Sequence, residues 1–293
     1  MSLEPGPAEV AERGTLEGLT ALVTGGGGGI GKVAAGVLAR DGASVMLMGR
    51  TASTLDLAAG EVAAAARFGA RVGTHVGDST TAAGVEAAVQ AAEGLGGRFA
   101  MCVAAVGGSK NAPLLLLEEE ALRAALDSNL VSAFLAVKYA TVAMARSGGG
   151  SIICISSTAA KLSWPYLASY CMAKAGVEAL VRVAADELGH LGIRVNAVRP
   201  GLTRTVRNAA LFETELHARF VEQKPLGRTG FPEDIAAGIR YLAGPESAWV
   251  TGQSLAIDGG HELRRATDLE VGARAAWGEE AVDDALAGRL PKR

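Results

Sequence analysis

The sequence has few of the residues that form disulfide frameworks and metal sites. Its 293 residues include three cysteines and four histidines. Cys102, Cys154 and Cys171 lie in apolar or helical stretches, and an odd number without regular spacing predicts neither disulfides nor a zinc site. His190 and His217 lack a paired Asp or Cys arrangement. We therefore expect no metal site and reduced cysteines in the core.

The chain also lacks an excess of basic residues and a long uninterrupted apolar run. Its 28 Lys and Arg residues stand against 31 Asp and Glu residues, which gives a formal net charge of −3. Interfaces with nucleic acid or an anionic membrane usually carry a basic patch, so this balance argues against both partners. Residues 1–18 lack the apolar segment of a signal peptide. We expect a cytoplasmic protein with a small-molecule partner.

Apolar residues are abundant, at 49% of the composition, and so is glycine, with 39 residues. The length fits one large α/β domain with a sizeable core. Short β-like runs alternate with alanine-rich helical patterns, which is typical of βαβ units in a parallel sheet. We expect strands at residues 19–24, 44–49, 70–75, 99–104, 151–156, 192–198 and 254–257, and helices at about 30–40, 52–67, 80–94, 118–146, 168–190 and 232–243. This pattern predicts a single α/β domain with a doubly wound parallel sheet of seven strands and helices on both faces.

The two ends of the chain do not share this alternation. We expect a flexible N-terminal tail over residues 1–14 and a folded domain over 15–263, with a substrate loop at about 202–225. Residues 264–293 form a C-terminal extension that is charged and has few large apolar side chains. We expect it to form a solvated helix or to dock on another subunit.

A glycine-rich turn joins the first expected strand to the first expected helix. Residues 24–31 read Thr-Gly-Gly-Gly-Gly-Gly-Ile-Gly. Such a turn can bring backbone N–H groups and the positive end of a helix against a diphosphate, because no side chain holds the phosphate away. A glycine run alone can be only a flexible turn, but the flanking strand and helix favour a nucleotide site.

The catalytic candidates lie in the middle of the chain. Tyr170 and Lys174 open a long helical pattern, and their spacing places the phenol and the ammonium on one helix face. Lowering a tyrosine pKa from about 10 by about three units takes roughly 4 kcal/mol, which Lys174 and a cationic nicotinamide ring could supply together. Ser157 closes a strand pattern, where its hydroxyl can reach a substrate carbonyl. Taken singly, these residues are equally compatible with an amphipathic helix and a turn.

The ordered set of motifs resembles the classical short-chain dehydrogenase/reductase family over nearly all of residues 18–260. The match comprises the glycine-rich turn 24–31, Asp78, Asn129, Ser157, Tyr170, Lys174, Pro200-Gly201 and the closing Ile257-Asp258-Gly259-Gly260. The interval between Ser157 and Tyr170 is the family's interval. The resemblance implies a Rossmann-type fold and NAD(P)-dependent, reversible hydride transfer between a nicotinamide cofactor and a carbonyl or secondary alcohol, as in 3-oxoacyl or ketone reductases.

The resemblance implies a role for each catalytic candidate. Tyr170 would be the general acid or base, and Ser157 would hold and polarise the carbonyl oxygen. Lys174 would lower the pKa of Tyr170 and bind the nicotinamide ribose. Asn129 would anchor a water that passes protons to Lys174, although read alone it is a candidate for a structural helix kink.

A larger set of residues is implied for the cofactor. Asp78 would accept a hydrogen bond from the adenine amino group, unless it is only a helix N-cap. Pro200-Gly201 would pass under the nicotinamide, with Thr203 or Thr205 near its amide or the diphosphate. The expected cofactor-binding residues are Thr24, Gly25, Gly28, Gly29, Ile30, Gly31, Arg50, Asp78, Ser79, Ala105, Gly107, Tyr170, Lys174, Pro200, Gly201, Thr203 and Thr205.

The chain departs from the family pattern after the fourth expected strand. Residues 104–106 are Ala-Ala-Val where most members carry Asn-Asn-Ala, so side-chain hydrogen bonds that usually stabilise the central sheet are missing. Gly107 is kept, and we expect cofactor binding to persist. The register of this loop and the shape of the pocket beside it are open, and Val106 is expected to narrow the site.

The second expected strand ends in residues that bear on cofactor choice. A carboxylate there would bind the ribose hydroxyls of NAD, but the position is Gly49 and Arg50 follows. A planar guanidinium suits the additional phosphate of NADP. The alternative is a surface arginine that caps the strand. We expect NADP(H) to be preferred, with NAD(H) possible.

The expected pocket walls are residues 106–110, 158–167 and 200–225. Their side chains are mainly apolar, which indicates an apolar carbonyl or alcohol substrate. Three cations, Lys110, Arg204 and Arg207, could meet the phosphates of a carrier-linked substrate such as an acyl-CoA, or be solvated surface. An enoyl or dienoyl thioester reductase is one alternative, although its common enoyl form spaces Tyr and Lys more widely. A catalytically silent NADP-binding regulatory protein is another. The Ala/Val-rich helices at 118–146 and 168–190 favour a homotetramer, as the resemblance implies.

Overall fold

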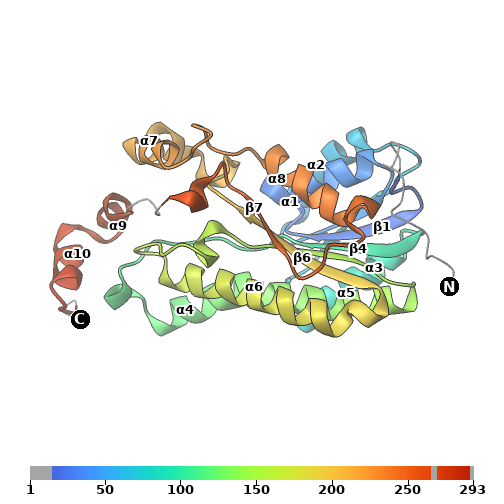
Figure 1. Ribbon diagram of the computed structural model, residues 1–293, viewed down its shortest axis with the longest axis horizontal. Coiled ribbons are helices and arrows are strands. Elements are labelled where there is room, and N and C mark those ends of the chain that lie inside the picture. The colour runs from blue at the N-terminus through green and yellow to red at the C-terminus, as the bar shows by residue number, and fades with distance from the viewer. Residues whose placement is uncertain (1–14, 265–268, 291–293) are drawn as a thin grey trace, which may run out of the picture.

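The strands form one parallel sheet in the order β3-β2-β1-β4-β5-β6-β7 (Figure 1). The computed structural model describes residues 15–264 and 269–290 of the chain. The strands are β1 (Leu19–Thr24), β2 (Ser44–Gly49), β3 (Val72–Val76), β4 (Arg98–Ala104), β5 (Gly150–Ile155), β6 (Ile193–Pro200) and β7 (Ser254–Ile257). Every neighbouring pair is parallel. The Rossmann-type sheet of seven strands expected from the sequence is confirmed.

Helices cover both faces of the sheet and bury it in two apolar clusters. One face carries α1 (Gly29–Arg40), α2 (Ala52–Ala65) and α8 (Pro232–Ala243), and the other carries α3 (Ala82–Glu93), α5 (Ser132–Arg146) and α6 (Ala168–Leu188). Burial on both faces explains why β1, β2 and β4 are almost continuous apolar runs. The crossovers bring the carboxyl ends of the strands to one edge, where ligands bind in such sheets.

The helix expected at 118–146 is interrupted. It consists of α4 (Glu119–Leu126), a π-helical turn η2 (Asp127–Val131) and α5. Asn129 lies in the π turn, and its amide donates to the carbonyl oxygen of Ala125. Turns of this kind often occur at functional sites. The stretch Glu119–Arg146 is long and apolar enough to cross a membrane, but half of its most apolar window is buried inside the molecule, as in a core helix.

Two further segments contain helices outside the six helical ranges expected from the sequence. The substrate loop contains the 3-10 helix η5 (Val206–Glu213) and α7 (Glu215–Glu222), and the extension contains α9 (Glu270–Trp277) and α10 (Glu279–Leu286). The extension is helical, as one of the two expectations had it, and its few apolar residues pack on its own chain. Docking on another subunit stays a prediction. The expected N-terminal tail at 1–14 lies outside the described residues.

Two glycines of α1 predict opposite effects on stability. A Cβ on Gly31 would lie 2.5 Å from the carbonyl oxygen of Gly25, whereas a Cβ on Gly36 would meet no described atom within 4 Å. Gly36→Ala should raise the free energy of unfolding by about 0.5–1 kcal/mol, since alanine loses less backbone entropy in a helix. Gly31→Ala should lower it, because backbone must move. Urea unfolding measures both, and an unchanged Gly31→Ala protein would contradict the packing described.

Candidate active site

The glycine-rich turn leaves open space at the amino end of α1. Gly28 is the residue before the helix, and no side chain caps it. A Cβ on Gly28 would meet no described atom within 4 Å, whereas one on Gly25 would lie 2.9 Å from the carbonyl oxygen of Ala105. Close packing against neighbouring backbone therefore requires glycine at positions 25 and 31. The open, uncapped helix end fits a diphosphate, while Ile30 packs against the apolar core below.

The loop after β4 is held by the π turn. Asn129, which is 1% exposed, accepts a hydrogen bond from the backbone N–H of Gly108 and donates one to the carbonyl oxygen of Gly108, both at 3.0 Å. Thr24 at the end of β1 accepts a bond of 3.2 Å from the N–H of Ala105. These bonds set the register that the Ala-Ala-Val sequence left open. The clamp from Asn129 was not expected from the sequence.

Lys174 is buried beneath this loop. It is 3% exposed, and its Nζ donates a hydrogen bond of 2.7 Å to the carbonyl oxygen of Ile155 at the end of β5. A Cβ on Gly107 would lie 3.2 Å from this Nζ and would clash with the side chain of Asn129. Burial lowers the pKa of Lys174 to about 8. Glycine at 107 is thus required by the side chains packed below it.

Tyr170 and Ser157 are hydrogen-bonded to each other. Ser157 Oγ also accepts a bond of 3.2 Å from the N–H of Ala159. The Nζ of Lys174 lies 5.7 Å from the centre of the Tyr170 ring. Burial raises the pKa of Tyr170, and the bond with Ser157 opposes this rise. In the chain without its cofactor the pKa of Tyr170 is thus raised, because burial is the largest effect. The lowering expected from Lys174 and a cationic nicotinamide ring together stays a prediction.

The adenine end of the expected site lies after β2 and β3. Asp78 accepts hydrogen bonds from the N–H and the hydroxyl of Thr80, which lower its pKa, and Arg50 adds a smaller lowering effect. Thr81, not Asp78, is the N-cap of α3, so the N-cap interpretation of Asp78 is wrong. Arg50 is exposed directly after β2, and Ser79 is buried. The guanidinium and the carboxylate are thus near enough to interact.

The segment after β6 reaches back to the glycine-rich turn. Pro200 ends β6, and the N–H of Gly201 donates to the carbonyl oxygen of Ile257. Thr203 donates its hydroxyl to the carbonyl oxygen of Gly201. Thr205 instead lies 3.6 Å from the position of a Cβ on Gly29. Of the two threonines, Thr205 is the one beside the glycine-rich turn.

An apolar cluster surrounds Tyr170. It contains Ala159, Trp164, Leu167, Phe220 and Leu269, with Leu162, Tyr166, Tyr170, Cys171, Leu202, Leu211 and Leu216 packed against it. The rings of Trp164 and Phe220 stack at 5.6 Å between centres. Most of these residues belong to the walls expected from the sequence. Leu269 was not expected, since it lies beyond the motifs in the charged extension.

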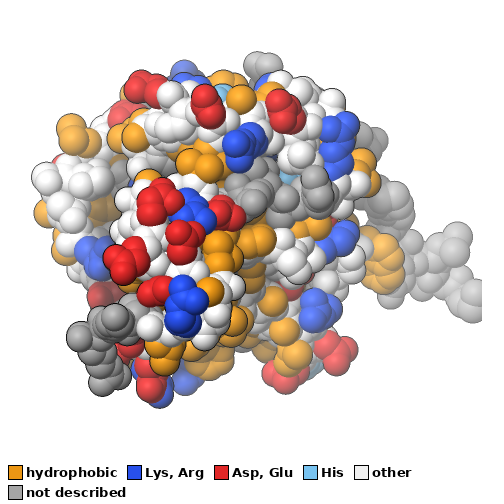
Figure 2. Space-filling model, turned by 90° about the vertical axis from the view of Figure 1, so that its left-hand side faces the viewer, with side chains coloured by type: hydrophobic (Ala, Val, Ile, Leu, Met, Phe, Trp, Pro, Cys, Tyr) orange, Lys and Arg blue, Asp and Glu red, His pale blue; other side chains and the backbone are white. Residues whose placement is uncertain are grey.

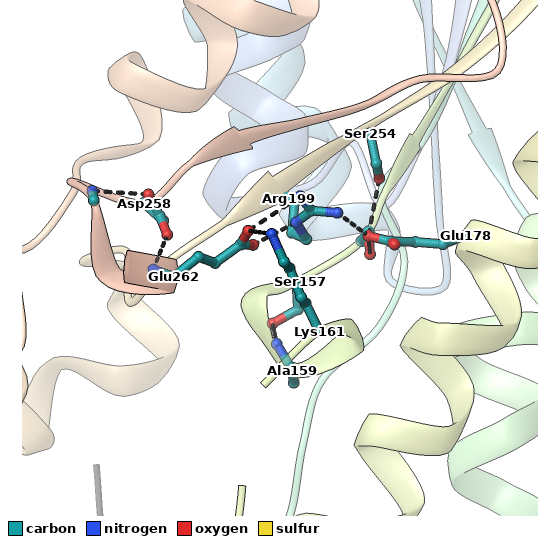
Figure 3. Close-up of polar contacts among 10 residues, drawn as sticks. Ser157, Ala159, Lys161, Glu178, Arg199, Ser254, Asp258 and Glu262 are labelled. Carbon is teal, nitrogen blue, oxygen red and sulfur yellow. Dashed lines mark hydrogen bonds and ion pairs between the residues drawn. The ribbon is translucent and has the colours of Figure 1, made fainter. Parts of the chain in front are cut away.

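A charged cluster joins three elements close to Ser157 (Figure 3). Arg199, near the end of β6, pairs with Glu178 on α6 and with Glu262 in the 3-10 helix η7 (His261–Leu263). Glu178 also accepts hydrogen bonds of 2.9 Å from Ser156 and Ser254. None of these contacts was expected. The only indication in the sequence was that Glu178 and Arg199 carry opposite charges within otherwise apolar helix and strand patterns.

Known proteins are similar to this chain in sequence and in fold. A family described as Enoyl-(Acyl carrier protein) reductase matches residues 26–262. A D-threitol dehydrogenase from Mycolicibacterium smegmatis is 33% identical over 253 residues, covering 85% of this chain and 95% of that protein. A 3-oxoacyl-(acyl-carrier-protein) reductase from Thermotoga maritima is 33% identical over 245 residues, covering 84% of this chain and 98% of that protein. The structure of a short-chain type dehydrogenase/reductase from Mycobacterium ulcerans has a TM-score of 0.88 at 37% identity, covering 92% of this chain and 98% of that one. The chain belongs to the short-chain dehydrogenase/reductase family of oxidoreductases, which use NAD(P).

Proposed function

We propose that the protein transfers hydride reversibly between a nicotinamide cofactor and a carbonyl or secondary alcohol carbon, with Tyr170 as the general acid and base. The observation that carries this proposal is the Ser157–Tyr170 hydrogen bond beside the buried Lys174, at the carboxyl end of β5. Two hydroxyls at one point suit a carbonyl oxygen that gains negative charge during reduction. Asn129 supports the site by holding the loop over Lys174.

The nicotinamide, when bound, supplies or takes up the hydride. Ser157 donates a hydrogen bond to the carbonyl oxygen and polarises it, and Tyr170 transfers its proton to that oxygen. Because burial raises the pKa of Tyr170, the phenol stays protonated at neutral pH, which is the form that reduction needs. Lys174 keeps its ammonium below about pH 8 and offers its remaining donors to the ribose hydroxyls.

Replacing the phenol hydroxyl tests this role. Tyr170→Phe should lower kcat by about 10²–10⁴-fold, the usual contribution of a positioned acid or base, with the NADPH dissociation constant nearly unchanged. The assay measures turnover of ketones, 3-oxoacyl thioesters, enoyl thioesters and alcohols, with NADPH binding followed by fluorescence.

Tyr241→Phe is the matched control, since Tyr241 lies on α8 on the opposite face of the sheet. Turnover retained in Tyr170→Phe would contradict the assignment. Reduction of the enoyl but not the 3-oxoacyl thioester would favour double-bond reduction, which the description of the matched family supports. NADPH binding without turnover of any substrate would favour the silent, regulatory alternative.

NADP(H) is the cofactor we propose, because Arg50 is exposed at the end of β2 where Gly49 offers no carboxylate. The cofactor residues proposed are those at the glycine-rich turn, with Asp78 and Ser79 at the adenine, and Ala105, Gly107, Pro200, Gly201, Thr203 and Thr205 towards the nicotinamide. Within this set, Thr205 is the threonine proposed near the diphosphate.

Removing the guanidinium should change affinity for one cofactor only. Arg50→Ala should weaken NADPH binding by roughly 10–100-fold, the value of a charge-assisted hydrogen bond of about 1.5–3 kcal/mol. NADH binding should change little. Arg123→Ala removes another exposed arginine, on α4, and should change neither constant. Equal weakening of NADPH and NADH binding by Arg50→Ala would count against the preference.

A homotetramer is the proposed assembly. Large apolar side chains are exposed on α5 at Phe134 and Val142, and on α6 at Met172 and Val183, and exposed patches of this kind mark interfaces. Sedimentation equilibrium should give a mass of four chains of 29.7 kDa. Phe134→Asp should reduce it, whereas Leu57→Asp on α2 should not. A monomer mass at all concentrations would refute the tetramer.

The cytoplasm is the proposed location. All three cysteines are free thiols, as is usual in a reducing compartment.

A further inference from the structure

The C-terminal extension packs against three of the segments that surround the candidate site. Trp277, the last residue of α9, donates a hydrogen bond of 2.9 Å from its indole Nε1 to the carbonyl oxygen of Asn111 in the loop after β4. Leu269 belongs to the same apolar cluster as Trp164, in the loop after β5, and Phe220, in the segment after β6. The extension therefore bridges the loops that follow three consecutive strands of the sheet.

The inner side of the extension is packed as a core is packed. Leu269 is 4% exposed, and Ala273 of α9 and Val282 of α10 are fully buried. The segment just before the extension is fixed as well. Glu262 in η7 forms ion pairs with Arg199 and with Lys161, which lies in the loop that follows Ser157. Packing along both helices and the ion pairs just before them make the extension part of the folded domain, and Leu269 places it against the apolar cluster around the candidate site.

The outer side of the extension is negatively charged. Residues 269–290 contain five acidic and two basic side chains. Arg274 pairs with Glu270, Glu279 and Asp283, and acidic side chains gather around basic ones on this face of the molecule (Figure 2). Such a face repels the phosphates of coenzyme A or phosphopantetheine at short range.

Two of the cations suggested for a carrier's phosphates are engaged elsewhere. Arg204 lies over the ring of Phe212, with its guanidinium carbon 4.3 Å from the ring centre. Arg207 donates a hydrogen bond of 2.7 Å to the carbonyl oxygen of Gly107. The contact of Arg204 lies within the substrate loop, and the hydrogen bond of Arg207 joins this loop to the loop after β4. A carrier's phosphates would have to compete with these contacts.

We infer that the C-terminal extension closes the substrate pocket against carrier-bound thioesters, so that the protein acts on free, compact carbonyl compounds or secondary alcohols. This inference rests on the proposed function and names its substrate class. The family match ends at residue 262, before α9. The Thermotoga maritima reductase aligns over 98% of its length with 84% of this chain, so the chain is longer than that relative.

The test presents one acyl group on two carriers. Acetoacetyl-coenzyme A and acetoacetyl-N-acetylcysteamine have the same reacting carbonyl, and kcat/KM with NADPH is measured for each. The intact protein should prefer the N-acetylcysteamine thioester by at least about tenfold, or ~1.4 kcal/mol, and a protein truncated after Leu263 should lose this preference. Equal use of both by the intact protein overturns the inference, and so does a preference that survives truncation.

Point variants keep the test decisive if the truncated chain does not fold. Leu269→Ala and Trp277→Ala loosen α9 while leaving it in place, and both should reduce the preference. Val271→Ala, on the same helix but 55% exposed, should leave it unchanged. Thermal unfolding and NADPH titration report whether each variant is folded. An unchanged preference in both folded point variants also overturns the inference.

A readout without turnover separates this inference from the proposed function. Cys171 packs against the cluster at Tyr170 and is half-buried, whereas Cys102 and Cys154 are fully buried. Modification of Cys171 by the bulky anion dithiobis(nitrobenzoate) should accelerate at least about tenfold, ~1.4 kcal/mol of barrier, in Leu269→Ala. Modification by small methyl methanethiosulfonate should accelerate less.

If neither thioester turns over but this acceleration occurs, the proposed function fails and the covering role of the extension stands. If turnover occurs but neither the preference nor the modification rate changes, the function stands and the inference fails.

Discussion

The geometry of the site depends on the buried ammonium of Lys174. A buried charge costs several kcal/mol unless it is hydrogen-bonded, and Lys174 meets this demand at the carbonyl oxygen of Ile155. That bond ties α6 to the end of β5. Tyr170 lies one helical turn before Lys174, and Ser157 lies two residues beyond Ile155. The bond thereby brings them close enough for Ser157 to affect the pKa of Tyr170.

The loops around Tyr170 take their shape from three glycines and from the side-chain amide of Asn129. Gly25, Gly31 and Gly107 lie where a Cβ would meet backbone or packed side-chain atoms, so the turn and the loop can approach the buried core closely. Asn129 reaches the loop after β4 because a π turn redirects its side chain from the helix. It supplies hydrogen bonds that the Ala-Ala-Val sequence cannot make.

The extension adds residues from the far end of the chain to the surroundings of the site. The parallel sheet leaves its carboxyl edge open, and loop segments from β4, β5 and β6 form the walls there. Leu269 and Trp277 join those walls from the far end of the chain, and the Arg199–Glu262 pair fixes the start of this segment. The extension is thus apolar on the inside, where it packs on the walls, and acidic on the outside.

The sequence by itself determined the order of strands and helices, the glycine-rich turn and the set formed by Ser157, Tyr170 and Lys174. The order of elements and the turn follow from periodicity and local spacing, and the set of three follows from the resemblance of the ordered motifs to a known family. Only the tertiary structure decided the direction of the Tyr170 pKa, the clamp of Asn129 on Gly108 and the docking of Leu269 beside Tyr170. These features depend on burial and on contacts between segments up to a hundred residues apart. Neither can be predicted from a local stretch of residues.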